Sequence, residues 1–324
     1  MSKAPVPPRE HGRFPYSPII DRPPLRWPNG ARVAVWLIPN IEHFLFDRPS
    51  TRNADGALNL NPDVLNYSWR DYGVRVGIWR MMEVMEKHGF KGTVALNSDV
   101  CKHYPRIIEE GKKLGWEWMG HGRTNSELIN HQSEDEERAL IAEVVGTITK
   151  SVGKAPRGWL SPALSETVNT LDILAEHGIE YVGNWVNDDQ PYPMKVKKGT
   201  MHAMPYSSEI NDIPAMLGHH KSGEEFAQMI RDQFDVLYEE GAQSGRVMAI
   251  CLHPYITGQP FEGADSLGWF ERSYDLAIQA GKKMGEQQVN EIDFDYGTPA
   301  YDRNTQRWQD ERELIKTGKM YLIR

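Results

Sequence analysis

Three side chains suited to acid–base chemistry stand at or just beyond the carboxyl ends of short β-rich segments. They are Glu42, His121 and His253. A carboxylate can take a proton from water, and an imidazole titrates near neutral pH and can deliver one. Each residue also has an ordinary structural explanation, as a helix cap, a turn residue or a buried histidine. Their shared position favours one common site, provided that the β-rich segments end close together.

Other charged residues flank segments of the same kind. Arg157 opens one segment, and Asp188 and Asp189 follow another. Arg157 is expected either to anchor a substrate carboxylate or to orient one of the two aspartates through paired hydrogen bonds. A surface ion pair and an acidic turn are the simpler interpretations. We include all three residues among the predicted catalytic residues.

Short β-rich segments alternate with amphipathic segments beyond Gly30, which is typical of βα units around a parallel sheet or barrel. In a parallel barrel the carboxyl ends of the strands meet at one mouth, where active sites are built. The sequence therefore predicts an α/β fold that brings the reactive residues together. We expect strands at residues 32–39, 92–97, 117–120, 158–161, 181–184, 201–206 and 246–253, and helices at 74–88, 135–150, 167–177 and 223–240.

Three regions are expected along the chain. Residues 1–30 contain eight prolines and should form an extended arm, because proline interrupts helices and strand ladders. Residues 31–260 should form the barrel. Residues 261–324, with a helix at 267–284, should complete or cover it. The arm packs on its own subunit or contacts another one, and together with the C-terminal tail it favours a homo-oligomer.

Composition narrows the classes of function. The formal net charge of -8, without a basic run, argues against a nucleic-acid partner. The two cysteines, Cys101 and Cys251, are far apart, which argues against a disulfide framework or a thiolate metal site. No segment has the apolar character of an export signal or a membrane helix. We therefore expect a cytoplasmic protein that acts on a small-molecule substrate and has no membrane partner.

Five motifs occur in chain order over about residues 25–260. They are IPNIEHF, GHGRTN, APRGWLSP, GNWVNDDQPY and ICLHPYITGQP. In this order they resemble the polysaccharide deacetylase superfamily. The HG pair, the DDQPY segment and the PYSSEIND segment are similar to the branch with metal-independent allantoinases, cyclic imide hydrolases and atypical peptidoglycan deacetylases. The resemblance implies a distorted, incomplete barrel of seven or eight β/α units that hydrolyses a C–N bond.

The sequence departs from the metal-binding pattern of that superfamily in two places. The resemblance puts Ile41 and Glu42 where an aspartate pair is usual, and Asn125, four residues after His121, where a second histidine is usual. Asparagine is a poor ligand for zinc, which prefers imidazole, thiolate or carboxylate. We therefore favour a site without a catalytic metal. Zn²⁺ or another divalent ion would need Glu42, His121 and a further ligand such as Asn125 or His43.

Hydrolysis of an amide needs a base, a donor to the carbonyl oxygen and an acid for the departing nitrogen. We assign Glu42 as the base that activates water, with His121 holding or sharing the proton. His253 is assigned as the acid. The candidates for polarising the carbonyl oxygen are Asn40, Asn125 and the backbone amides near Gly120 and Gly122.

The other predicted site residues suit a small, flat substrate. A cyclic imide or ureide is already activated at its carbonyl, whereas an N-acetyl group benefits more from a metal ion. Two alternatives stay open: a metal-dependent N-deacetylase acting on an N-acetylated sugar or peptidoglycan fragment, and a barrel that binds a small molecule without turnover. The expected pocket walls are Trp159, Trp185 and Tyr192, and the expected acceptors for ring N–H groups are Glu209, Asn211 and Asp212.

Overall fold

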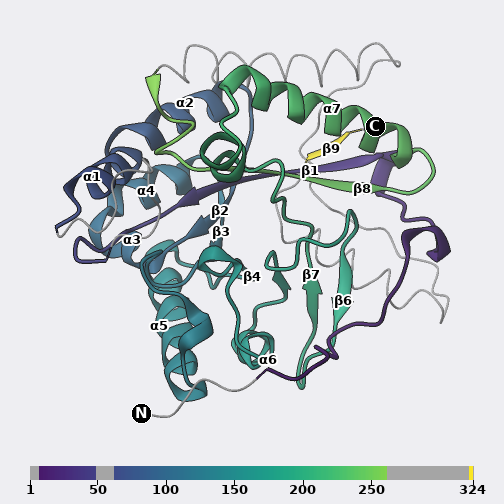
Figure 1. Cartoon of the computed structure of the whole chain (residues 1–324), viewed down its shortest axis with the longest axis horizontal. Helices are drawn as coiled ribbons and strands as arrows, with labels where there is room; N and C mark the ends of the chain where they lie inside the picture. The colour runs from purple at the N-terminus through teal and green to yellow at the C-terminus, as the bar shows by residue number, and fades with distance from the viewer. Residues whose placement is uncertain (1–6, 49–61, 261–320, 324) are drawn as a thin grey trace.

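A computed structural model describes residues 7–48, 62–260 and 321–323 of the chain. In these residues one curled sheet has the strand order β6-β7-β5-β4-β3-β2-β1-β8, and β9 pairs with β1 (Figure 1). All pairings are parallel except β6 with β7 and β9 with β1. The strands are β1 (Val33–Ile41), β2 (Thr93–Leu96), β3 (Glu117–Gly120), β4 (Gly158–Trp159), β5 (Tyr181–Val182), β6 (Tyr192–Met194), β7 (Met201–Ala203), β8 (Arg246–Leu252) and β9 (Tyr321–Ile323).

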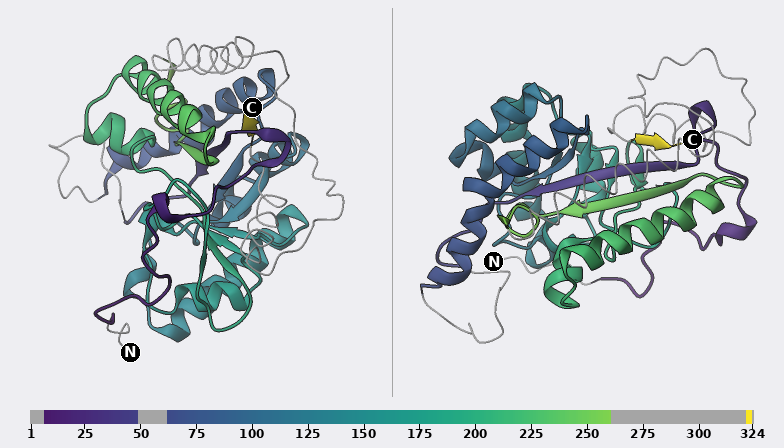
Figure 2. Two further views of the ribbon diagram at one scale, coloured as in Figure 1. Left: turned by 90° about the vertical axis from the view of Figure 1, so that its right-hand side faces the viewer. Right: turned by 90° about the horizontal axis from the view of Figure 1, so that it is seen from above.

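Helices surround the curled sheet, and the longest ones lie along its outside (Figures 1 and 2). α7 runs beside β8, and α5 packs against β3. No helix in the described ranges is both long and apolar enough to cross a membrane. The α-helices are α1 (Val64–Tyr72), α2 (Ile78–Lys87), α3 (Ser98–His103), α4 (Pro105–Lys113), α5 (Glu134–Val152), α6 (Thr170–Glu176) and α7 (Gly223–Gly241); the shorter helical turns are η1 (Ile19–Asp21), η2 (Pro28–Gly30), η3 (Gly73–Gly77), η4 (Ile129–His131), η5 (Pro162–Leu164) and η6 (Ile213–Gly218).

The strand register brings the ends of β8, β1, β2 and β3 to one edge. Pro39 of β1 is paired with Leu252 of β8. On the other side of β1, Ile41 pairs with Leu96 of β2, which in turn pairs with Gly120 of β3. The residues that follow these strands therefore emerge side by side. Because parallel strands share their direction, this edge is the mouth that the sequence predicts.

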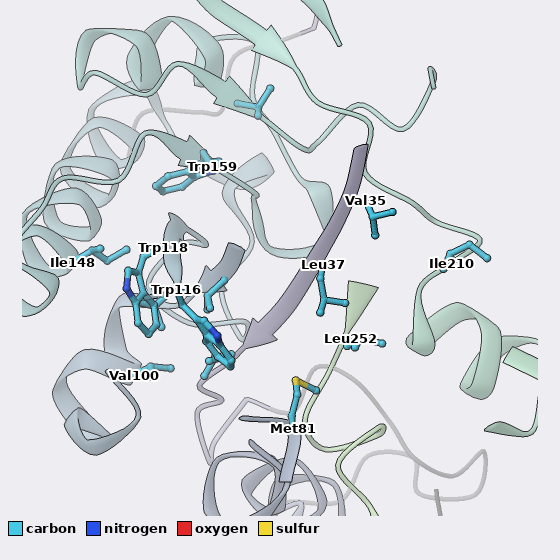
Figure 3. Packing of buried hydrophobic residues seen from close by; sticks show 14 of the residues in the cluster. Val35, Leu37, Met81, Val100, Trp116, Trp118, Ile148, Trp159, Ile210 and Leu252 are labelled. Carbon is cyan, nitrogen blue, oxygen red and sulfur yellow. The ribbon is translucent and has the colours of Figure 1, made fainter. Parts of the chain in front are cut away.

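β1 is buried on both faces, as expected for a strand inside a parallel sheet. Val35 and Leu37 belong to the large cluster between sheet and helices (Figure 3). Trp36 belongs to a second cluster and meets Tyr181 of β5 at 6.2 Å between ring centroids. Since three strands separate β1 from β5 in the sheet, this contact crosses the inside of the curl. The second cluster therefore fills the interior of the half-barrel.

The sheet does not close between its edge strands β8 and β6, and irregular backbone fills this side. The amide of Val247 donates to the carbonyl of Asp189 at 2.8 Å, and that of Cys251 donates to the carbonyl of Ile210 at 3.0 Å. These bonds satisfy the β8 edge without a further strand. The segments that carry Asp189 and Ile210 are thereby tied to β8. This arrangement decides which loop residues reach the mouth.

The N-terminal arm packs on its own chain across the same side (Figure 2). Its described part, residues 7–30, is extended apart from two short helical turns. Arg13 is paired with Asp172, with 3.1 Å between nitrogen and oxygen, and the carbonyl of Leu25 accepts from Gly245 N at 2.9 Å. The extended conformation follows from the prolines, and the polar contacts hold the arm against the half-barrel.

The observed elements differ from the expected ones mainly where elements are short. β3 has the expected bounds, and β8 ends one residue early, at Leu252. α1, α3, α4 and β6 were not expected, since none of them has a long periodic pattern. The helix expected at residues 74–88 begins as the π-helical turn η3 and continues as α2. The helix expected at residues 267–284 lies outside the described residues.

Candidate active site

Glu42 is the centre of a buried polar group at the mouth. It is the first residue beyond β1, and its side chain is 2% exposed. Its Oε1 lies 3.4 Å from Nε2 of His121 and 3.6 Å from Nε2 of His253. The amide of Asn125 also donates to Oε1, while the hydroxyl of Tyr255 donates to Oε2 at 3.0 Å. The structure therefore brings together all three residues predicted to carry the acid–base chemistry.

The surroundings favour the charged forms of both Glu42 and His253. Burial raises the pKa of Glu42, but the charge of His253 and the hydrogen bond from His121 outweigh it, so the pKa is below its usual value. Burial lowers the pKa of His253, but the charges of Asp212 and Glu42 outweigh it, so this pKa is above its usual value. The centre can thus hold a carboxylate and an imidazolium side by side.

Asp212 orients His253. Its Oδ1 lies 2.6 Å from Nδ1 of His253, and its Oδ2 accepts from the backbone amide of the same histidine at 2.6 Å. Asp212 is fully buried. The pair directs Nε2 of His253 toward Glu42, because Nδ1 is held by the carboxylate. The sequence predicts Asp212 as an acceptor for substrate ring N–H groups, whereas in the structure its carboxylate is fully buried and both oxygens bond to His253.

His121 is held in a similar way from the neighbouring strand. Its Nδ1 lies 2.5 Å from the carbonyl oxygen of Leu160, so Nε2 faces Glu42. Both ring nitrogens thus face oxygen atoms, the carbonyl of Leu160 and the carboxylate of Glu42. The chain turns directly after this residue, where Gly122 has a φ of 66°. A side chain at Gly122 would be strained and would press on Pro162.

Asn97 connects the three segments of the site, and its role was not predicted. Its Oδ1 accepts from the amide of His43 at 2.9 Å. Its Nδ2 donates to the carbonyl of His121 and to Oδ1 of Asn125, the latter at 3.2 Å. Asn97 directly follows β2, so the rule that selected Glu42 would have selected it too. It sets the spacing between the loops after β1, β2 and β3.

Tyr255 was also missed, although it stands two residues after His253. Its loop packs against the π-helical turn η3, where Gly77 touches the backbone of Pro254 and Gly258 so closely that any side chain there would overlap them. π-helical turns are often found beside functional sites. The loop after β8 is therefore fixed by its contact with η3, and Tyr255 is held against Glu42.

The residues expected to hold a metal do not fit one. Asn125 accepts from Asn97 through its only side-chain oxygen and points its amide N–H₂ at Glu42. A donor therefore occupies the place where a metal ligand would need a lone pair. The ring of His43 stacks on His103, and its Nδ1 lies 3.3 Å from the hydroxyl of Tyr104. The set of Glu42, His121 and Asn125 or His43 is not a metal site in this arrangement.

Several predicted site residues lie elsewhere. Arg157 is paired with Glu180, and Asp188 is paired with Arg22 of the arm at 2.6 Å. The expectation that Arg157 orients Asp188 or Asp189 is therefore wrong. Arg157 contacts Glu180 instead, and the partner of Asp188 is Arg22. The carbonyl of Asp189 is bonded to β8, and burial is the main cause that raises the pKa of its carboxyl group.

The expected pocket walls do not surround Glu42. Trp159 is fully buried in the large core cluster and donates to Ser161 at 2.9 Å, so the expectation that it walls a substrate pocket is wrong. Trp185 packs on Phe14 of the arm. Tyr192 lines a cavity of about 730 Å³ between the arm and the half-barrel. Asp188, Asp189 and Glu209 line the same cavity.

Asn40 and Asn211 both contact Tyr206, which lines this cavity. The amide of Asn40 donates to the carbonyls of Ile38 and Leu252 at 3.2 and 3.3 Å. The hydroxyl of Tyr206, which lines the cavity, lies 3.5 Å from Oδ1 of Asn40 and 3.3 Å from Nδ2 of Asn211. The amide of Asn40 is therefore engaged with backbone, and this residue holds β1 and β8 together at the mouth.

A family model and a curated relative both link this chain to polysaccharide deacetylases. Residues 67–182 match the sequence profile of the Polysaccharide deacetylase family. A Schizosaccharomyces pombe protein whose name refers to a polysaccharide deacetylase is 26% identical over 272 residues, which cover 74% of this chain and 85% of that protein.

Two crystal structures share the curled α/β sheet. A probable polysaccharide deacetylase from Pseudomonas aeruginosa PAO1 is 25% identical, with a TM-score of 0.68 over 80% of this chain and 89% of the other. PuuE allantoinase is 24% identical, with a TM-score of 0.67 over 80% and 88% of the two chains. The fold is thus the distorted, incomplete barrel that the sequence motifs predict.

Proposed function

Because this chain belongs to the polysaccharide deacetylase superfamily, we propose that it hydrolyses a C–N bond in a small cyclic amide, imide or ureide. One observation carries the proposal. A buried carboxylate, Glu42, faces Nε2 of His121 and Nε2 of His253 at hydrogen-bonding range or slightly beyond. A carboxylate between two oriented imidazoles suits acid–base hydrolysis.

In the proposed mechanism Glu42 takes a proton from a water molecule as its oxygen attacks the carbonyl carbon. The imidazolium of His253 then gives its Nε2 proton to the departing nitrogen as the C–N bond breaks. Direct transfer of the proton from Glu42 to His253 restores the starting state, since the two groups face each other at 3.6 Å. The charge of the buried centre is the same before and after each cycle, which avoids the cost of an unpaired buried charge.

His121 is proposed as the donor to the carbonyl oxygen of the substrate. Its Nε2 is directed toward the space beside Glu42 because Leu160 holds the other ring nitrogen. Because Nδ1 donates to Leu160, Nε2 carries a hydrogen only when both ring nitrogens are protonated, and in that form it can donate to the carbonyl oxygen as it becomes negative. The amides of Asn40 and Asn125 are bonded to other groups, so we transfer this role from them to His121.

The donor set favours an activated substrate. Asn125 directs an N–H group at Glu42, so the proposed mechanism uses no Lewis acid. A cyclic imide or ureide is more reactive at its carbonyl than an unactivated N-acetyl group, and general acid–base catalysis alone can open it. The fold shared with PuuE allantoinase is in keeping with such a substrate.

A direct test uses protein that is purified without added metal. The bound metals are measured by elemental mass spectrometry, and the same sample is assayed with allantoin, hydantoin, succinimide and an N-acetylated sugar oligomer, with and without a chelator. We expect turnover of a cyclic substrate that the chelator does not change. Release of acetate that depends on a stoichiometric ion would contradict the proposal.

The second candidate is a metal-dependent N-deacetylase acting on a sugar. The names of the relatives from S. pombe and P. aeruginosa favour it. It would require Asn125 to turn its oxygen toward an ion and to lose the hydrogen bond from Asn97. A barrel that binds a ligand without turnover would not need the charged pair of Glu42 and His253, and it would show binding of a cyclic amide without product.

A further inference from the structure

His43, Asp99 and His103 form a cluster that the proposed reaction does not use. One ligand atom from each lies within 4.8 Å of the other two. Among the residues that the structure describes, it is the one group of three histidine, cysteine or acidic side chains that meets this spacing. The rings of His43 and His103 are stacked, with 4.5 Å between centroids.

The cluster has the donor types and spacing of a metal site. Asp99 and His103 are four residues apart on α3, so they lie on the same face of the helix. Two imidazoles and one carboxylate suit Zn²⁺ and similar divalent transition ions, whereas Mg²⁺ and Ca²⁺ prefer oxygen ligands throughout. We propose that His43, Asp99 and His103 bind a divalent transition-metal ion of this class.

The existing contacts leave donor atoms for the ion. Tyr104 bonds to Nδ1 of His43, which leaves Nε2 for coordination and fixes the ring through its outer contact. Lys102 binds Oδ1 of Asp99 at 2.8 Å, so Oδ2 is left for the ion, and Lys102 has a second partner in Glu143 at 2.9 Å. His103 is exposed at the end of α3 and can turn its ring out of the stack.

One cation already contacts the cluster. Lys102 is bonded to Asp99 and also pairs with Glu143. An ion would therefore share the Asp99 carboxylate with Lys102. A divalent ion would replace the stacking of His43 on His103 by coordination of both rings to the same ion.

The site would act on the active centre through the backbone. The amide of His43 donates to Asn97, and its carbonyl accepts from the amide of Asn125 at 3.0 Å. An ion on His43 and α3 would therefore hold the segment that carries Glu42 without touching the reacting atoms. This proposal concerns metal binding alone and does not depend on the proposed hydrolysis.

The test is a titration of the full chain, stripped of metal, with Co²⁺ and Zn²⁺. Co²⁺ binding is followed by visible absorption and Zn²⁺ binding by competition with a coloured chelator, both without substrate. We expect one ion per chain, with an affinity that falls at least about tenfold in His103→Ala and in Asp99→Asn. The exposed residue His131 provides the matched control, and His131→Ala should bind as the unchanged chain does.

A further variant separates this site from the Glu42 centre. Glu42→Gln should keep the affinity for Co²⁺. Unchanged binding in His103→Ala, or absence of binding in the unchanged chain, would overturn the proposed metal site. Loss of the ion in Glu42→Gln together with its retention in His103→Ala would place the ion at Glu42, and it would contradict both this site and the metal-free mechanism.

Discussion

Glu42 and His43 are consecutive residues whose side chains lie in two different environments. The carboxylate of Glu42 is 2% exposed and is enclosed by His121, His253, Asn125 and Tyr255. The ring of His43 instead stacks on an exposed histidine of α3. Successive side chains of extended backbone point to opposite sides. The end of one strand therefore supplies Glu42 to the closed centre and His43 to a second cluster, of which only His103 is exposed.

The largest expected effect is that of Glu42→Gln. Removing the base should lower kcat by about 10²- to 10⁴-fold on whichever cyclic substrate is turned over. Steady-state kinetics would measure this loss, and circular dichroism would check the fold. The matched control is Glu110→Gln, which changes a carboxylate on α4 that is paired only with surface cations. Activity of Glu42→Gln within a few-fold of the unchanged chain would remove Glu42 from the chemistry.

Asp212→Asn should have the next largest effect, about 100-fold on kcat, with little change in KM. Each oxygen of Asp212 accepts from one N–H group of His253, the ring Nδ1–H or the backbone N–H. Asparagine has a single side-chain oxygen and can accept from only one of the two, so the ring loses its orientation. Loss of the Asp212 charge should also move the alkaline limb of the kcat profile to lower pH, since that charge raises the pKa of His253. An unchanged alkaline limb would reduce Asp212 to a structural role.

Asn125→His should make the closed centre resemble a metal site. An imidazole at this position can offer a lone pair beside Glu42 and His121 where the amide now donates. We expect one additional bound ion per chain by elemental mass spectrometry, and this ion should persist in the double variant with His103→Ala. If no additional ion is found, the donor at position 125 is not what prevents metal binding.

The pH dependence of the free energy of unfolding should reflect the charged pair. The lowered pKa of Glu42 contributes stability above the ordinary glutamate value of about 4.3, and this is lost as the pH falls through the folded pKa. The raised pKa of His253 contributes stability below about 6.5, and this is lost as the pH rises through its folded value. Urea unfolding should therefore show both contributions in full between these values, and Asp212→Asn should flatten the alkaline side.

The smallest effect is expected for Arg157→Gln. Arg157 and Glu180 form a partly exposed pair away from Glu42, so kcat/KM should stay within about twofold and the free energy of unfolding should change by about 0.5 kcal/mol or less. Kinetics and urea unfolding on the same preparation would measure both. A 100-fold loss in kcat would show that Arg157 takes part in catalysis and would contradict its assignment to a surface ion pair.

Much of the site could be predicted because it depends on local patterns. Apolar β-rich runs set where β1, β3 and β8 lie, and parallel pairing brings their carboxyl ends together, so Glu42, His121 and His253 meet as expected. Asn97 follows the same rule and was overlooked. The short elements α3 and β6 could not be predicted in this way, because so few residues carry no periodic signal.

The sequence by itself therefore determined the fold class, the order of the strands along the chain and the residue types that gather at the mouth. Tertiary structure decided which of these residues touch. Asp212 reaches His253 across 41 positions, and Arg22 takes Asp188 away from Arg157, because loops and arm fill the open side of the sheet. The orientation of the Asn125 amide likewise depends on Asn97 from another strand. Such contacts join distant segments and follow from packing and hydrogen-bond satisfaction, which no local pattern of residues encodes.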